Sequence, residues 1–104
     1  MEKVLIDVFT VPQESRAEFV EAADKARRFI KTLPGFVEGY VYEQKEGPSH
    51  YNFLTTAVWE SEEAFENAKK TVAVEFQKQG FNPQETRQRL KIEGARSTYE
   101  RSPY

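Results

Sequence analysis

The sequence predicts an α+β protein with a ferredoxin-like split βαβ arrangement, in which helices cover one face of a four-stranded antiparallel sheet. Three observations support this prediction. Strand and helix patterns follow one another in the order β-α-β-β-α-(α)-β, their connections are short, and 104 residues suffice for one domain. With right-handed crossovers, this order gives the split βαβ arrangement. We therefore treat residues 1–104 as a single domain.

The first two elements are a strand and a long helix. Residues 3–11 (KVLIDVFTV) are apolar on both sides except at Asp7 and Thr10, so this strand is expected to be covered on both faces. Residues 13–33 follow a helical period, and a Leu-Pro-Gly sequence ends the helix. The inward stripe of this helix is expected to contain Phe19, Val20, Ala23, Ala26, Ile30 and Leu33.

The middle of the chain is expected to form a hairpin. Residues 36–44 and 51–59 are strands, joined by a loop at 45–49 that contains glycine and proline. Strict alternation places on one face of the first strand Phe36, Glu38, Tyr40 and Tyr42. The corresponding face of the second strand presents Tyr51, Phe53, Thr55, Ala57 and Trp59.

Two helices and a strand complete the prediction. Ser61 is a good N-cap for a helix that reaches about residue 79. Asn82, followed by a proline and a glutamate, predicts a short helix to about residue 90, and residues 91–100 form the last strand. Lys69 and Lys70 are expected on a solvated helix face. The residues expected to point inward from the second helix are Phe65, Ala68, Val72 and Phe76.

Composition excludes several functions. The 15 Lys and Arg residues nearly balance 17 Asp and Glu, and a formal charge of −2 argues against bulk binding to nucleic acid or to an anionic membrane. The absence of cysteine excludes disulfides and thiol chemistry, and it suits a cytoplasmic protein. No apolar run approaches ~18 residues, so neither a transmembrane helix nor a signal peptide is expected.

The aromatic content and the bare sheet face indicate a pocket and a dimer. Eight Phe, five Tyr and one Trp give a core that either packs solid or lines a flat hydrophobic pocket. The face of the sheet without helices receives apolar side chains from residues 3–11. A second copy of the chain is the simplest cover for that face, so we expect a homodimer.

Two segments resemble the antibiotic biosynthesis monooxygenase family: LPGF at residues 33–36 and VWESEEAFENA at residues 58–68. The resemblance extends over nearly the whole chain. It implies a dimeric α+β barrel with an active cavity between the sheet and the helices of each subunit. It also implies one of several activities, since the family includes cofactor-free quinone-forming monooxygenases, quinol monooxygenases and haem-degrading enzymes.

The resemblance further implies a set of site residues. The tryptophan that the polyketide monooxygenases place at the end of the third strand matches Trp59. Their asparagine four residues earlier corresponds to Thr55, and their histidine near the end of the second strand corresponds to Tyr42, so only one of three is retained. The substrate-binding residues implied by the cavity are Tyr40, Tyr42, Tyr51, Thr55, Phe65 and Ala68.

The haem-degrading branch fits this sequence poorly. Its asparagine, tryptophan and histidine correspond to Asp7, Ala68 and about Lys78. Because none of these matches and the axial histidine is missing, we expect no haem and no other cofactor. His50 is the only histidine, and it is either a general base or a solvated loop residue. One histidine without cysteine also predicts no metal site.

Asp7 is the most informative departure from the apolar pattern. A carboxylate that faces an aromatic cavity is less stable in its charged form and can act as a base. Alternatively, Asp7 pairs with Arg96 on the last strand or with tyrosine hydroxyls. The two interpretations are compatible, and both stay open at this point.

The favoured function is a cofactor-independent monooxygenase that acts on a small aromatic molecule of phenol, hydroquinone or anthrone type. Asp7 would be the catalytic base, the tyrosines and Thr55 would orient the ring, and Trp59 would form the catalytic pocket wall. One alternative is a non-catalytic dimer that binds an aromatic ligand. Another is an isomerase on the same scaffold, which needs only an acid and a base. A further alternative is a solid core without a pocket.

Overall fold

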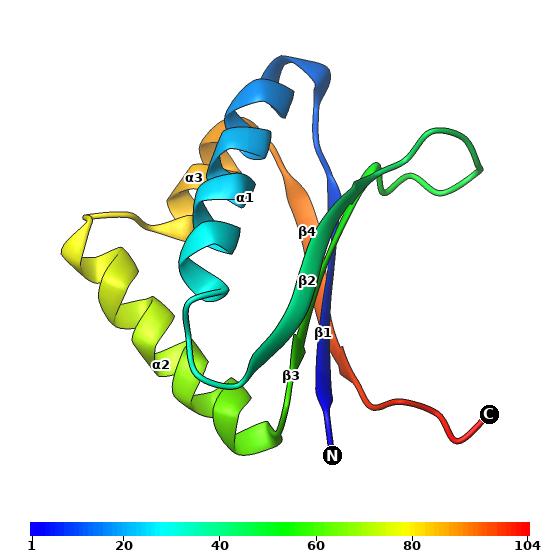
Figure 1. Cartoon of the computed structure of the whole chain (residues 1–104). Coiled ribbons are helices and arrows are strands. Elements are labelled where there is room, and N and C mark those ends of the chain that lie inside the picture. The colour runs from blue at the N-terminus through cyan, green and yellow to red at the C-terminus, as the bar shows by residue number, and fades with distance from the viewer.

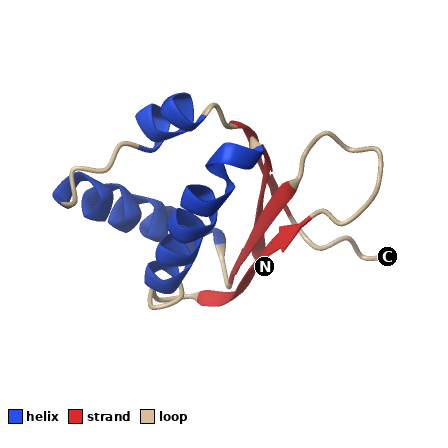
Figure 2. Ribbon diagram, turned by 90° about the horizontal axis from the view of Figure 1, so that it is seen from above, coloured by secondary structure: helices blue, strands red, loops and turns tan.

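The computed structural model describes residues 1–104 as an antiparallel sheet with all its helices on one side (Figures 1 and 2). The strand order β2-β3-β1-β4 confirms the ferredoxin-like α+β prediction. None of the helices combines the length and apolar content that crossing a bilayer requires. Along the chain the elements are β1 (Lys3–Thr10), η1 (Gln13–Ser15), α1 (Arg16–Ile30), β2 (Phe36–Glu43), β3 (Phe53–Trp59), α2 (Glu62–Lys78), α3 (Pro83–Leu90) and β4 (Glu93–Tyr99).

The helix starts follow the predicted caps, with one difference. The Ser61 hydroxyl accepts a hydrogen bond from the Ala64 amide, and the Asn82 side chain accepts from the first amides of α3. The first predicted helix begins instead with the 3-10 turn η1. At the end of that turn the buried Ser15 hydroxyl donates to the carbonyl oxygen of Leu90 at 2.7 Å. This bond joins the start of α1 to the end of α3.

Two apolar clusters lie between the sheet and the helices, and a polar row separates them. On β1, Phe9 packs against the first cluster and Leu5 against the second, with Asp7 between them. The register partners of Asp7 are Thr55 on β3 and Arg96 on β4. The first cluster is built around Val11, Phe19 and Phe53. The second cluster is built around Trp59, Phe65 and Ala68.

Strand β2 contains a β-bulge that the alternation argument did not foresee. Phe36 lies opposite Trp59, but Glu38 lies opposite Val58, so Val37 is an extra residue. After this bulge the two tyrosines of β2 share a face with Thr56 and Leu54, on the side of the sheet away from the helices. The prediction that Tyr40 and Tyr42 share the face of Phe36 is therefore wrong.

Candidate functional site

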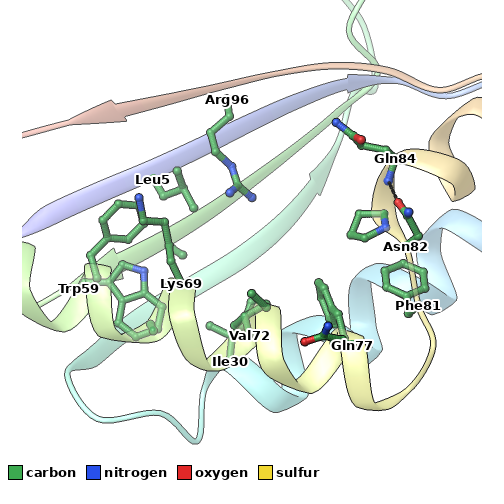
Figure 3. A pocket seen from close by; sticks show the side chains of 16 residues that line it. Leu5, Ile30, Trp59, Lys69, Val72, Gln77, Phe81, Asn82, Gln84 and Arg96 are labelled. Atoms are coloured by element: carbon green, nitrogen blue, oxygen red, sulfur yellow. Dashed lines mark hydrogen bonds between the residues drawn. The ribbon is translucent and has the colours of Figure 1, made fainter.

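A pocket of about 600 Å³ lies between α2, the α2–α3 loop and the helix-facing side of the sheet (Figure 3). Its volume falls within the range of roughly 300–1,000 Å³ that is common for small-molecule sites. Ten of its 16 lining residues are hydrophobic. The lining residues come from β1, α1, β3, α2, the α2–α3 loop, the start of α3 and β4, so every strand except β2 contributes to the pocket.

Trp59 forms one wall of the pocket. It is the last residue of β3, it is 3% exposed, and its indole ring meets the Phe36 ring edge-on at 5.4 Å between centroids. Its Nε1–H group is buried and has no hydrogen-bond partner in the protein. Leaving a buried donor without a partner costs about 1–3 kcal/mol. A ligand oxygen next to Nε1 would remove this cost.

Asp7 and Arg96 form a bidentate ion pair beside the pocket. Arg96 Nε donates to Asp7 Oδ1 at 2.8 Å, and Nη2 donates to Oδ2 at 3.2 Å. The pair forms because the two residues are register partners on neighbouring strands. The Asp7 side chain is 15% exposed, whereas that of Arg96 is 57% exposed and borders the pocket. The predicted pairing of Asp7 with Arg96 is confirmed.

Lys69 lines the pocket from α2, although the sequence suggested a solvated position. Its Nζ atom lies 4.9 Å from the centroid of the Phe65 ring and 3.2 Å from a carboxylate oxygen of Glu66. Phe65 and Lys69 are four residues apart, which places them on the same side of the helix. This spacing from Phe65, which is expected to point inward, could have indicated from the sequence that Lys69 lies beside the pocket.

The far end of the pocket is formed by the α2–α3 loop and the start of α3. The rings of Phe76 and Phe81 meet edge-on at 5.0 Å, and Asn82, Pro83 and Gln84 complete this end. The backbone amide of Gln84 donates to the side chain of Asn82, as the dashed line in Figure 3 shows. Apart from Phe76, expected to point inward, sequence reasoning did not place these residues in a site, because a loop between helices has no period.

The structure brings together only part of the predicted site. Trp59, Phe65 and Ala68 line the pocket. Thr55 faces the same side as Asp7 but does not line the pocket. Tyr40 and Tyr42 are 47% and 52% exposed on the open sheet face, because the bulge reverses their orientation.

Tyr51 and His50 lie away from the pocket. Tyr51 precedes β3, which starts two residues later than predicted, and its ring lies 4.0 Å from that of His50. Both residues belong to the segment between β2 and β3, and neither lines the pocket. No cluster of three His, Cys, Asp or Glu side chains suited to a metal ion occurs in the chain.

The chain is thus an α+β protein with an apolar pocket between the sheet and its helices and a charged pair at the edge of that pocket. The sequence profile of the antibiotic biosynthesis monooxygenase family matches residues 4–78. The chain therefore belongs to this family. No curated protein matches the chain by sequence.

Several solved structures share the fold over nearly the whole chain. SnoaB, a cofactor-independent oxygenase from Streptomyces nogalater, is 22% identical, covers 99% of this chain and 95% of its own, and has a TM-score of 0.70. A variant of MhuD with two manganese protoporphyrin IX bound per active site is 19% identical. It covers 94% of this chain and 92% of its own, and has a TM-score of 0.71. A dabb family protein with a ferredoxin-like fold from Mesorhizobium loti is 14% identical. The match covers 97% of each chain and has a TM-score of 0.68.

Proposed function

We propose that the protein is a cofactor-independent monooxygenase that oxidises a small, ionisable aromatic ring of phenol, hydroquinone or anthrone type. The observation that carries the proposal is the apolar pocket with an unpartnered Trp59 Nε1–H group in its wall and the Asp7–Arg96 pair at its edge. Family membership and the fold shared with the oxygenase SnoaB support it. A porphyrin fits this pocket less well, since its lining offers no His, Cys, Tyr or Met as an axial iron ligand.

The proposed reaction needs only the substrate and O₂. The bound phenol or anthrone loses a proton, and the resulting anion passes one electron to O₂. The two radicals combine to form a carbon–oxygen bond and a peroxide. Loss of water from the peroxide gives the quinone, so one oxygen atom stays on the ring and the other leaves as water. The ring supplies every electron that O₂ takes up.

The pocket lining supplies two donors, Trp59 and Arg96, and Asp7, behind Arg96 at the pocket edge, supplies a proton acceptor. Asp7 accepts the substrate proton, since a carboxylate held by Arg96 still has free lone pairs on both oxygens. The Arg96 guanidinium stabilises the substrate anion. Trp59 Nε1–H donates to an oxygen on the ring, and the apolar walls exclude water from the reacting anion.

Oxygen uptake with a panel of hydroquinones and anthrones tests the proposal. Asp7→Asn keeps an oxygen that accepts from Arg96 but takes up no proton, so kcat should fall by about a hundredfold or more. Asp24→Asn, at an exposed carboxylate paired with Arg28 on α1, is the matched control and should keep its rate. Wild-type uptake no faster than the spontaneous rate, or an unchanged rate in Asp7→Asn, would contradict the proposal.

A second candidate function is the binding of an aromatic ligand without turnover. The bidentate contact from Arg96 favours it, because the guanidinium occupies a lone pair on each carboxylate oxygen of Asp7. Such a protein would show affinity for the same rings without consuming O₂. An isomerase, the other alternative, would convert its substrate in the absence of O₂.

A further inference from the structure

Cations are the only charged side chains that line the pocket. Lys69 reaches it from α2 and Arg96 from β4, and no carboxylate is among the lining residues (Figure 3). Each cation is paired with a carboxylate that lies outside the lining, Lys69 with Glu66 and Arg96 with Asp7. Attraction of an anionic ligand therefore depends on direct contact with donor groups of these two cations that their carboxylate partners leave free.

Arg96 is held in a fixed orientation with one donor group unused. Its Nε and Nη2 atoms donate to Asp7, and Nη1 makes no hydrogen bond within the chain. The Asp7 carboxylate fixes the guanidinium from the sheet side, because it is the less exposed partner of the pair. The unused nitrogen is therefore available to a ligand at the pocket edge.

Lys69 can exchange its present partner for a ligand. Its ion pair with Glu66 joins two side chains that are each 48% exposed, and such surface pairs contribute little to stability. The ammonium already lies 4.9 Å from the Phe65 ring in the pocket wall. A short movement of a flexible side chain would bring it to an anionic group on a ring bound against Phe65.

We propose that the pocket selects aromatic molecules that carry a carboxylate. The ring would lie against Trp59 and Phe65, and the carboxylate would lie between Lys69 and the unused nitrogen of Arg96. For turnover this inference rests on the proposed oxygenase function, but the selection itself concerns binding. A neutral ring of the same shape would gain only the apolar contacts.

Calorimetric binding of 2-naphthoate and of its neutral analogue 2-naphthamide tests the selection. A charge-assisted contact of this kind should make the dissociation constant of the naphthoate about tenfold lower in the wild type. Lys69→Gln should abolish most of this preference, because it removes a charge that only the naphthoate carboxylate contacts. Lys70→Gln is the matched control, because Lys70 neighbours Lys69 on α2 but does not line the pocket. Thermal unfolding verifies that both variants fold.

Three results would overturn the selection: equal affinity for the two probes, binding of neither probe, or an equal loss of preference in both lysine variants. Oxygen uptake with a carboxylated hydroquinone and its amide separates this inference from the proposed function. A carboxylate preference in binding without O₂ consumption would refute the oxygenase and leave the selection. Consumption of both hydroquinones with equal kcat/KM would refute the selection and leave the oxygenase.

Discussion

At the scale of residues, much of the support for a ligand site comes from the buried indole nitrogen of Trp59. Trp59 lines the apolar pocket, and its buried Nε1–H group has no partner, although a buried donor normally finds one. The indole packs well, with Phe36 and Phe65 as neighbours in the second apolar cluster. The fold thus stabilises the ring without satisfying its polar atom, which is the pattern expected when the partner is a ligand.

We expect Trp59→Phe to weaken the binding of 2-naphthol about tenfold, because the variant keeps an aromatic wall but lacks the donor. Calorimetry measures the affinity. Phe36→Leu is the control, since it loosens packing against the same indole without removing a polar group. It should lower thermal stability and keep the naphthol affinity. Equal affinity in Trp59→Phe and the wild type would exclude Nε1 as a ligand contact.

The site could be predicted from the sequence only where local spacing or family resemblance applies. Trp59 at the end of its strand and Phe65 on the inward stripe of α2 were identified correctly as pocket residues. Arg96 was identified only as a partner of Asp7. Its place at the pocket edge depends on the register between β1 and β4, which connects residues 89 positions apart. Local sequence patterns extend over a few residues and cannot predict a strand register between residues so far apart in the sequence.

Element boundaries were predictable because caps and breakers act locally. Ser61 and Asn82 begin their helices as expected, and the strands begin or end within about two residues of the prediction. The bulge in β2 was not predictable, since Val37 has nothing in its side chain that marks an extra residue. Val20, assigned to the inward stripe of α1, is 36% exposed, so that stripe is narrower than the period suggested.

Two ion pairs between elements make stability depend on pH. Arg16 at the start of α1 donates to both carboxylate oxygens of Glu43 at the end of β2 and so lowers the pKa of Glu43. Arg89 on α3 lowers the pKa of Glu18 on α1 in the same way. In the unfolded chain both glutamates return to the ordinary value of 4.5. The stability that they contribute is complete above that value and is lost as pH falls through the lower, folded values.

We therefore expect the free energy of unfolding to fall on acidification, and Glu43→Gln to show a shallower fall than the wild type. Urea denaturation between about pH 6 and pH 3 measures both slopes. Glu46→Gln removes a loop carboxylate that makes no ion pair, and it should follow the wild-type curve. Parallel curves for Glu43→Gln and the wild type would show that the contact with Arg16 does not affect folding.

The isolated chain is flat and buries little of its surface. Its extents are 40 × 38 × 18 Å, and only 9 of 104 residues are buried. The accessible area of 7486 Å² exceeds the roughly 6,000 Å² expected for a folded monomer of this mass. The open sheet face accounts for part of the excess, because Tyr40, Tyr42 and Tyr99 are about half exposed there.

The homodimer predicted from the sequence would cover this open face. Ile6 lies near its centre, opposite Thr56 and Ser97, so Ile6→Glu should convert the dimer into a monomer. Sedimentation equilibrium measures the mass. Val74→Glu is the matched control, because it places the same charge at a half-exposed valine that lies on α2 and not on the sheet. A wild-type mass near 12.1 kDa at every concentration would rule out the dimer.

The bulge at Val37 also matters for comparing relatives with one another. Because side chains alternate along a strand, one extra residue exchanges odd and even positions in the rest of β2. Deleting Val37 alone would remove the bulge and leave Glu38 opposite Val58, so Tyr40 and Tyr42 would stay on the open face. A relative without the extra residue would therefore pair with β3 in the same way but have one residue fewer in this strand. An alignment that places no gap at Val37 would then equate residues that point in opposite directions.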